Sequence, residues 1–111
     1  MIGGSLSPEK MKKLQDEYKS SFRQKMQTFQ ELIQAVQKTP TLETLGALRF
    51  SVHKLAGSAG TYGFDKVSQI CKTWELEIVA QIKTFPPDPQ WLSHFHEPLE
   101  AIETALYDKS K

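Results

Sequence analysis

The sequence has little cysteine: Cys71 is the single cysteine among 111 residues, so no internal disulfide can form. The fold must therefore be held by packing, and a reducing cytoplasm is the expected location. An excess of one charge is also missing, because 14 Lys and Arg residues stand against 13 Asp and Glu residues. Proteins that bind nucleic acid or anionic membranes usually carry a basic excess, so neither partner is expected.

Long apolar runs are missing as well, and none approaches the roughly 20 residues that a membrane-spanning helix needs. The opening stretch MIGGSLS is short, polar and glycine-containing, unlike a signal peptide. A chain of this length supports one hydrophobic core. We therefore expect a flexible leader at 1–6, one domain at 7–108 and a tail at 109–111.

What the sequence does contain is apolar residues that recur every three or four positions, the pattern of amphipathic helices. A first long helix is expected to begin at Pro8, after the N-cap residue Ser7, and to end before Thr39. A second helix is capped by Thr41. The glycine-rich stretch 57–63 is expected to end it.

A third helix is expected from Phe64 until the Phe-Pro-Pro sequence at 85–87. A fourth begins after the N-cap residue Asp88, and Pro98 is expected to kink it, because proline cannot donate to the carbonyl of His94. Alternation of apolar and polar residues, the mark of a strand, is absent. The predicted fold is all-α, a four-helix bundle with up-down-up-down topology.

The second helix carries one histidine away from its apolar stripe. At 100° per residue, His53 lies roughly 120° from the centre of that stripe, where solvent can reach it. Gly46, Phe50, Ala56 and Gly57 share its sector, and glycine inside a helix costs on the order of 1 kcal/mol relative to alanine. Small neighbours open the imidazole to another folded domain. Two plainer interpretations stay open: Gly46 allows a neighbour to pack closely, and Gly57 begins the fraying of the helix.

The sequence HKLAGSAGTYGF at residues 53–64 resembles the signature of histidine phosphotransfer (Hpt) domains. That signature is a histidine, an apolar residue two later, Gly-Ser four and five later, and a glycine ten later. The next helix resembles the family's apolar-Cys and apolar-Glu pattern with Ile70-Cys71 and Trp74-Glu75. The resemblance implies a four-helix bundle whose His53 carries a phosphoryl group in a two-component phosphorelay.

The resemblance also implies the partners, which are receiver domains and a histidine kinase, and a chain that acts as a monomeric carrier and not as an enzyme. A receiver would bring an aspartate, magnesium and a lysine, so this domain needs no cofactor or metal. The sequence agrees, since it has no phosphate-binding glycine loop and no carboxylate cluster. His53 is the expected nucleophile, with these surrounding and docking residues: Gly46, Arg49, Phe50, Lys54, Ala56, Gly57 and Ser58. Gly60 and Gly63 are expected to form a structural turn that lets the second and third helices come close.

One departure from the family concerns charge near His53. Many members carry a lysine three residues after the histidine, where this chain has Ala56. A lysine placed at that position is expected to lie on the imidazole's side of the helix. Lys54 lies about 100° round the helix, and whether it replaces the missing lysine stays open. Ser58 has two open roles, a hydrogen bond near the imidazole or a cap for the fraying helix.

Two other functions compete with phosphotransfer. The same fold could serve as an interaction scaffold that transfers nothing, or His53 could be the general base of an enzyme. The second is disfavoured, because no acid or nucleophile shares the His53 sector of its helix. His94 and His96 are two residues apart and make a poor metal pair. Cys71, Trp74 and Trp91 are expected in the core.

Overall fold

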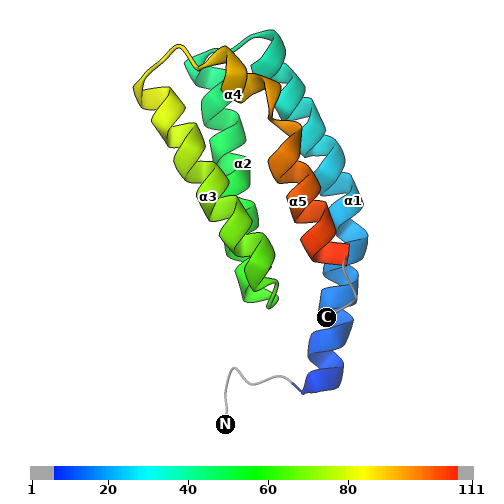
Figure 1. The fold of residues 1–111 in the computed structure, drawn as a ribbon. Coiled ribbons are helices and arrows are strands. Elements are labelled where there is room, and N and C mark those ends of the chain that lie inside the picture. The colour runs from blue at the N-terminus through cyan, green and yellow to red at the C-terminus, as the bar shows by residue number, and fades with distance from the viewer. Residues whose placement is uncertain (1–6, 108–111) are drawn as a thin grey trace.

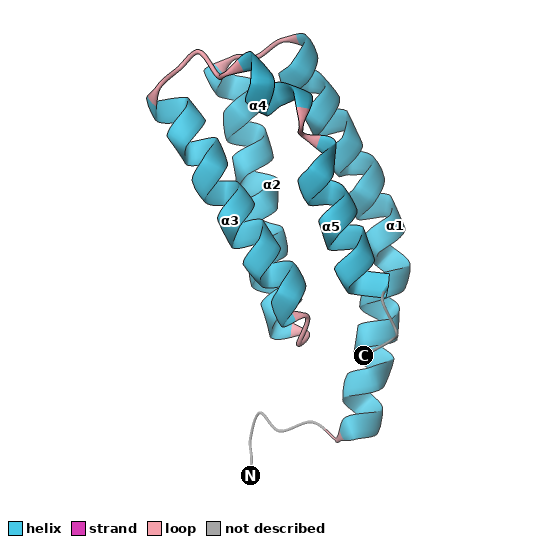
Figure 2. Cartoon of the chain, in the orientation of Figure 1, coloured by secondary structure: helices cyan, strands magenta, loops and turns pink. Residues whose placement is uncertain are grey.

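The computed structural model describes residues 7–107 (Figure 1). It contains five helices: α1 (Pro8–Lys38), α2 (Leu42–Thr61), α3 (Asp65–Lys83), α4 (Pro89–Ser93) and α5 (His96–Tyr107). Figure 2 shows helices and connecting loops, with no strand among these residues. The all-α prediction is therefore confirmed. The expected leader at 1–6 and tail at 109–111 lie outside the described residues, as does residue 108 of the expected domain.

The first two helices begin where the sequence predicts. Ser7 caps α1, and Pro8 occupies its first position. Thr41 caps α2 through a reciprocal pair of bonds with Thr44: each residue's backbone N–H donates to the other's hydroxyl oxygen at 3.0 Å. These side chains satisfy N–H groups that a helix end leaves without partners.

The end of α2 falls inside the glycine-rich stretch 57–63, as expected. The helix continues past Gly57 and ends at Thr61. Its last turns are packed, since Ala59 is fully buried, and such packing outweighs the low helix propensity of glycine. The chain turns at Gly63, whose φ is +84°, a conformation that suits glycine. Phe64 N–H then donates to the Ala59 carbonyl at 2.8 Å and closes the turn.

The fourth predicted helix is two helices in the structure. α4 and α5 are separated at His94 and Phe95, one turn before Pro98. Pro98 stands in the first turn of α5, where a missing N–H is tolerated. The His94 carbonyl accepts a bond from Glu97 N–H at 3.1 Å instead. The helix is therefore interrupted between α4 and α5, where a kinked but continuous helix was expected.

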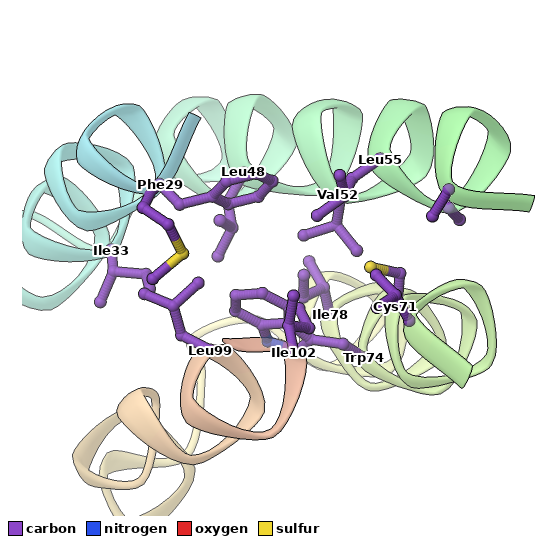
Figure 3. Close-up of a cluster of buried hydrophobic side chains, with 14 of the residues drawn as sticks. Phe29, Ile33, Leu48, Val52, Leu55, Cys71, Trp74, Ile78, Leu99 and Ile102 are labelled. Atoms are coloured by element: carbon purple, nitrogen blue, oxygen red, sulfur yellow. The ribbon is translucent and has the colours of Figure 1, made fainter. Parts of the chain in front are cut away.

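Long helices lie side by side around one core. Figure 1 shows α1, α2, α3 and α5 running alternately up and down, with α4 at the upper end and the first turns of α1 extending beyond the rest. α2 packs against both α1 and α3, and α5 packs against α3. The buried side chains of these helices converge (Figure 3). The largest fully buried side chains are Trp74, Phe22, Phe95, Leu45 and Leu48.

Two expected core residues differ in burial. Cys71 is fully buried on α3, as predicted. Burial raises the pKa of its thiol to about 12, so Cys71 is no nucleophile. Trp91 is only partly buried, and its ring stands edge-on against Phe95 at 4.4 Å between centroids. Trp91 therefore covers the core from the α4 side.

Candidate functional site

His53 lies on the outer face of α2, with 69% of its side chain exposed. The buried face of this helix, which packs against α1 and α3, comprises Leu45, Leu48, Val52, Leu55, Ala56 and Ala59. Because side chains step by about 100° along a helix, the residue after Val52 points away from this face. The structure therefore holds the imidazole on a rigid helix and opens it to solvent.

A carboxylate from the neighbouring helix contacts the imidazole. Glu75 of α3 places Oε1 and Oε2 at 3.1 and 3.2 Å from His53 Nδ1. Arg49, one turn before His53, places Nε at 3.3 Å from Oε2 of the same carboxylate. The Glu75 side chain is only 16% exposed, so its position is well constrained. These three residues form what we call the Glu75 cluster.

The contact with Glu75 selects the form of the imidazole. An ionised carboxylate only accepts hydrogen bonds, so Nδ1 must carry the hydrogen. In neutral imidazole the other nitrogen, Nε2, then holds a lone pair. None of the residues 7–107 forms a hydrogen bond with Nε2. The Glu75 cluster thus leaves one nucleophilic nitrogen facing solvent.

Glu75 is the residue that reasoning about the His53 sector of α2 misses. The helix of His53, α2, has no acidic residue in that sector, and the acid comes from α3 instead. The available signal was the Trp74-Glu75 pair in the family pattern. The objection that His53 lacks an acidic companion is therefore wrong.

The two glycines near His53 border open space. A Cβ atom built on Gly46 or Gly57 meets nothing within 4 Å. Gly46 therefore does not serve close packing, and Gly57 is not a fraying end, because α2 continues to Thr61. Phe50 is 63% exposed. Lys54 lies beside it, with Nζ at 5.2 Å from the ring centroid.

Two expected site residues face other helices. Ala56 is only 5% exposed and lies at the contact with α3, where its carbonyl accepts a bond from Ser68 Oγ at 2.9 Å. The helical-wheel placement of Ala56 on the exposed sector is therefore wrong. A lysine there would have to extend from a packed interface to reach solvent.

Ser58 also points away from the imidazole. Its hydroxyl forms a hydrogen bond with the hydroxyl of Tyr18 on α1, at 2.7 Å. Neither role considered for Ser58 holds: it does not contact His53, and it does not cap a fraying end. Instead it joins α2 to α1.

Of the two expected turn glycines, only Gly63 forms the turn between α2 and α3; Gly60 lies in the last turn of α2, so the turn predicted for it is wrong. A Cβ on Gly60 would stand 3.4 Å from Ser68 Oγ, an ordinary contact distance. Gly63 combines its positive φ with a neighbour, Gln15 Nε2, at 3.1 Å from the position of a Cβ. The positive φ would strain any other side chain at residue 63, and the Gln15 amide would have to shift to admit it.

The remaining candidates do not form a site. His94 and His96 are exposed, and His94 Nδ1 lies 2.7 Å from the Gln90 carbonyl. Among residues 7–107, no group of three His, Cys, Asp or Glu side chains is placed to hold a metal ion. In the same range, no helix has both the length and the apolar content to cross a membrane.

Fold and site together define a helical domain that presents a single histidine on an open helix face. The family model of the Hpt domain matches residues 13–105. The chain therefore belongs to the Hpt domain family, as the resemblance in its sequence implies. No curated protein and no solved structure matches the chain. Hpt domains are phosphocarriers that interact with receiver domains and histidine kinases in two-component phosphorelays.

Proposed function

We propose that this domain accepts a phosphoryl group on His53 Nε2 from the phospho-aspartate of one receiver domain and passes it to the aspartate of another. The observation that carries the proposal is the exposed imidazole whose Nδ1 is bonded to Glu75. The receiver would supply magnesium and the catalytic groups, so this domain is a carrier. We further propose a monomer in the cytoplasm, in which α4 and α5 act together as the fourth helix of an up-down-up-down bundle.

The chemistry of transfer fits this geometry. The Nε2 lone pair attacks phosphorus, the N–P bond forms, and the P–O bond to the aspartate breaks as the carboxylate leaves. No proton has to leave Nε2, because the hydrogen is already on Nδ1. The ring gains positive charge during the attack. The Glu75 carboxylate beside Nδ1 stabilises that charge, as the acid of a catalytic triad does for its histidine.

The face around His53 suits a docking partner. Phe50 and Leu42 are large apolar side chains that stay exposed on α2. Leu42 precedes His53 by eleven residues, about three turns, so both point in nearly the same direction. Gly46, between Leu42 and Phe50, and Gly57, one turn after His53, add no side chain to α2. An exposed apolar side chain is ordinary by itself, but two of them on the helix that carries an accessible nucleophile support a contact surface for the receiver.

The test is transfer from a phosphorylated receiver domain to wild type and to His53→Gln. Wild type should acquire an acid-labile, base-stable phosphate, and His53→Gln should acquire none while keeping wild-type helicity and melting behaviour. The unchanged fold is expected because an exposed side chain contributes little packing. The matched control is His94→Gln, which removes another exposed histidine and should be labelled like wild type.

Two results would contradict the proposal. Label retained on His53→Gln would show that another residue is the acceptor. A wild-type domain that binds the receiver but is never labelled would favour the scaffold that transfers nothing.

A further inference from the structure

One carboxylate serves two basic side chains in the Glu75 cluster. Oε2 of Glu75 lies 3.3 Å from Arg49 Nε and 3.2 Å from His53 Nδ1. Arg49 precedes His53 by four residues, the spacing at which two side chains on a helix are neighbours. Helical side chains lean toward the N-terminus, so the imidazole leans toward the turn that holds Arg49.

Phosphorylation would change the charge of this cluster sharply. A phosphoryl group adds between one and a half and two negative charges near neutral pH, close to the carboxylate of Glu75. The two anions would repel each other across the imidazole. Among residues 7–107, Arg49 is the Lys or Arg side chain that forms an ion pair with Glu75. Lys54 lies instead beside Phe50, round the helix from this contact.

Arg49 has N–H donors that can bind the negatively charged phosphoryl oxygens. A guanidinium carries five N–H donors in a planar fork. Nε is the atom nearest Glu75, so the two Nη groups, with four N–H bonds, stay available for a second anion. Half of the Arg49 side chain is exposed, at 51%, and it can turn without disturbing the core.

We infer that Arg49 is a positioning residue for both states of His53, in an ion pair with Glu75 when the imidazole is free and turning its Nη donors to the phosphoryl oxygens when Nε2 is phosphorylated. The inference rests on the proposed function, since it needs phosphorylated His53. Arg49 thereby supplies the cation that α2 does not offer at Ala56. It lengthens the lifetime of the phosphorylated state, whereas in the unphosphorylated state it pairs with Glu75.

The lifetime of phosphorylated His53 measures this role. Potassium phosphoramidate phosphorylates histidine chemically, so the domain can be labelled without a receiver. Because His94 and His96 are also exposed, every variant carries His94→Gln and His96→Gln, and the decay of the phosphorus NMR signal then reports on His53. Arg49→Gln should shorten the half-life by roughly two- to fivefold at low salt, the effect of one exposed ion pair. The difference should shrink as salt is added. Arg49→Lys should recover part of the lifetime, because lysine keeps the charge but loses the planar fork.

The matched control is Lys72→Gln, an exposed lysine on α3 one turn before Glu75. This variant loses the same charge near the site but not the ion pair, and its lifetime should equal that of wild type. Equal lifetimes for Arg49→Gln and wild type, at low salt and with intact helicity, would overturn the inference and leave the proposed function standing. A shortened lifetime for Lys72→Gln equal to that of Arg49→Gln would also overturn it, since general charge would then be the cause.

Failure of the proposed function gives a different pattern. If phosphoramidate labels His53 but a phosphorylated receiver does not, transfer is disproved and the lifetimes still test Arg49. If neither donor labels His53, both the proposed function and the inference are wrong.

Discussion

Gly57 is the residue that we expect to control access to the imidazole. It lies one turn after His53 on the same face of α2, is exposed, and borders empty space. Its backbone is helical, so any L-residue can adopt its conformation. Open access and high helix stability are therefore in conflict at this position.

Substitution of Gly57 can separate these two properties. Gly57→Ala should raise the free energy of unfolding by up to about 1 kcal/mol and leave transfer nearly unchanged, because a methyl group adds little bulk. Gly57→Leu should raise stability similarly but slow transfer from a receiver at least several-fold. Urea unfolding and transfer kinetics on the two variants provide the measurement. Equal transfer rates for Gly57→Leu and wild type would show that the partner does not approach over Gly57.

At the scale of elements, the last two turns of α2 depend on both neighbouring helices. Ala59 is buried, and Ser68 Oγ of α3 donates to the Ala56 carbonyl. On the other side, the hydroxyls of Ser58 and Tyr18 meet at 2.7 Å. These contacts hold a segment with two glycines in a helix that its own propensity would not sustain.

The contact between Ser58 and Tyr18 is testable with a double-mutant cycle. Ser58→Ala and Tyr18→Phe should each lower the free energy of unfolding by about 0.5–1.5 kcal/mol, the value of a partly buried hydrogen bond. The double variant should lose less than the sum, because both changes remove the same bond. Transfer to His53 should stay near wild type in all three. Additive losses in urea unfolding would show that the two hydroxyls do not stabilise each other.

At the scale of the whole molecule, the core is built from every long helix and contains one ionisable thiol. Cys71 is fully buried on α3, and burial raises the pKa of its thiol from the ordinary 9.0 to about 12. Below pH 9 the thiol is protonated in both the folded and the unfolded chain. Above it, the unfolded chain loses the proton while the folded chain keeps it.

Stability should therefore fall as the pH rises from about 9 toward 12, because the unfolded state binds fewer protons there. One thiol contributes at most about 1.4 kcal/mol per pH unit. Tyr18, whose pKa is raised mainly by burial, acts in the same direction. Urea unfolding of wild type and Cys71→Ala at about pH 8 and about pH 10.5 isolates the thiol. The variant should lose less stability between the two pH values, and an equal loss would contradict a buried, protonated thiol.

The sequence by itself determined what depends on local order along the chain. The apolar repeat of three to four residues specified the helices, and Ser7, Thr41 and Asp88 marked where they begin. The same repeat placed His53 away from the core, because helical geometry alone decides which residues share a face. The signature at 53–64 identified the family. All of this depends on residues within a few turns of one another.

Only the tertiary structure decided which helices supply the rest of the site. Glu75 reaches His53 across 22 residues of sequence, from a different helix. Ala56 faces α3 and Ser58 faces α1, because α2 packs between these two helices. The same packing extends α2 beyond Gly57. Contacts between helices have no fixed period in the sequence, so a pattern within one helix cannot show them.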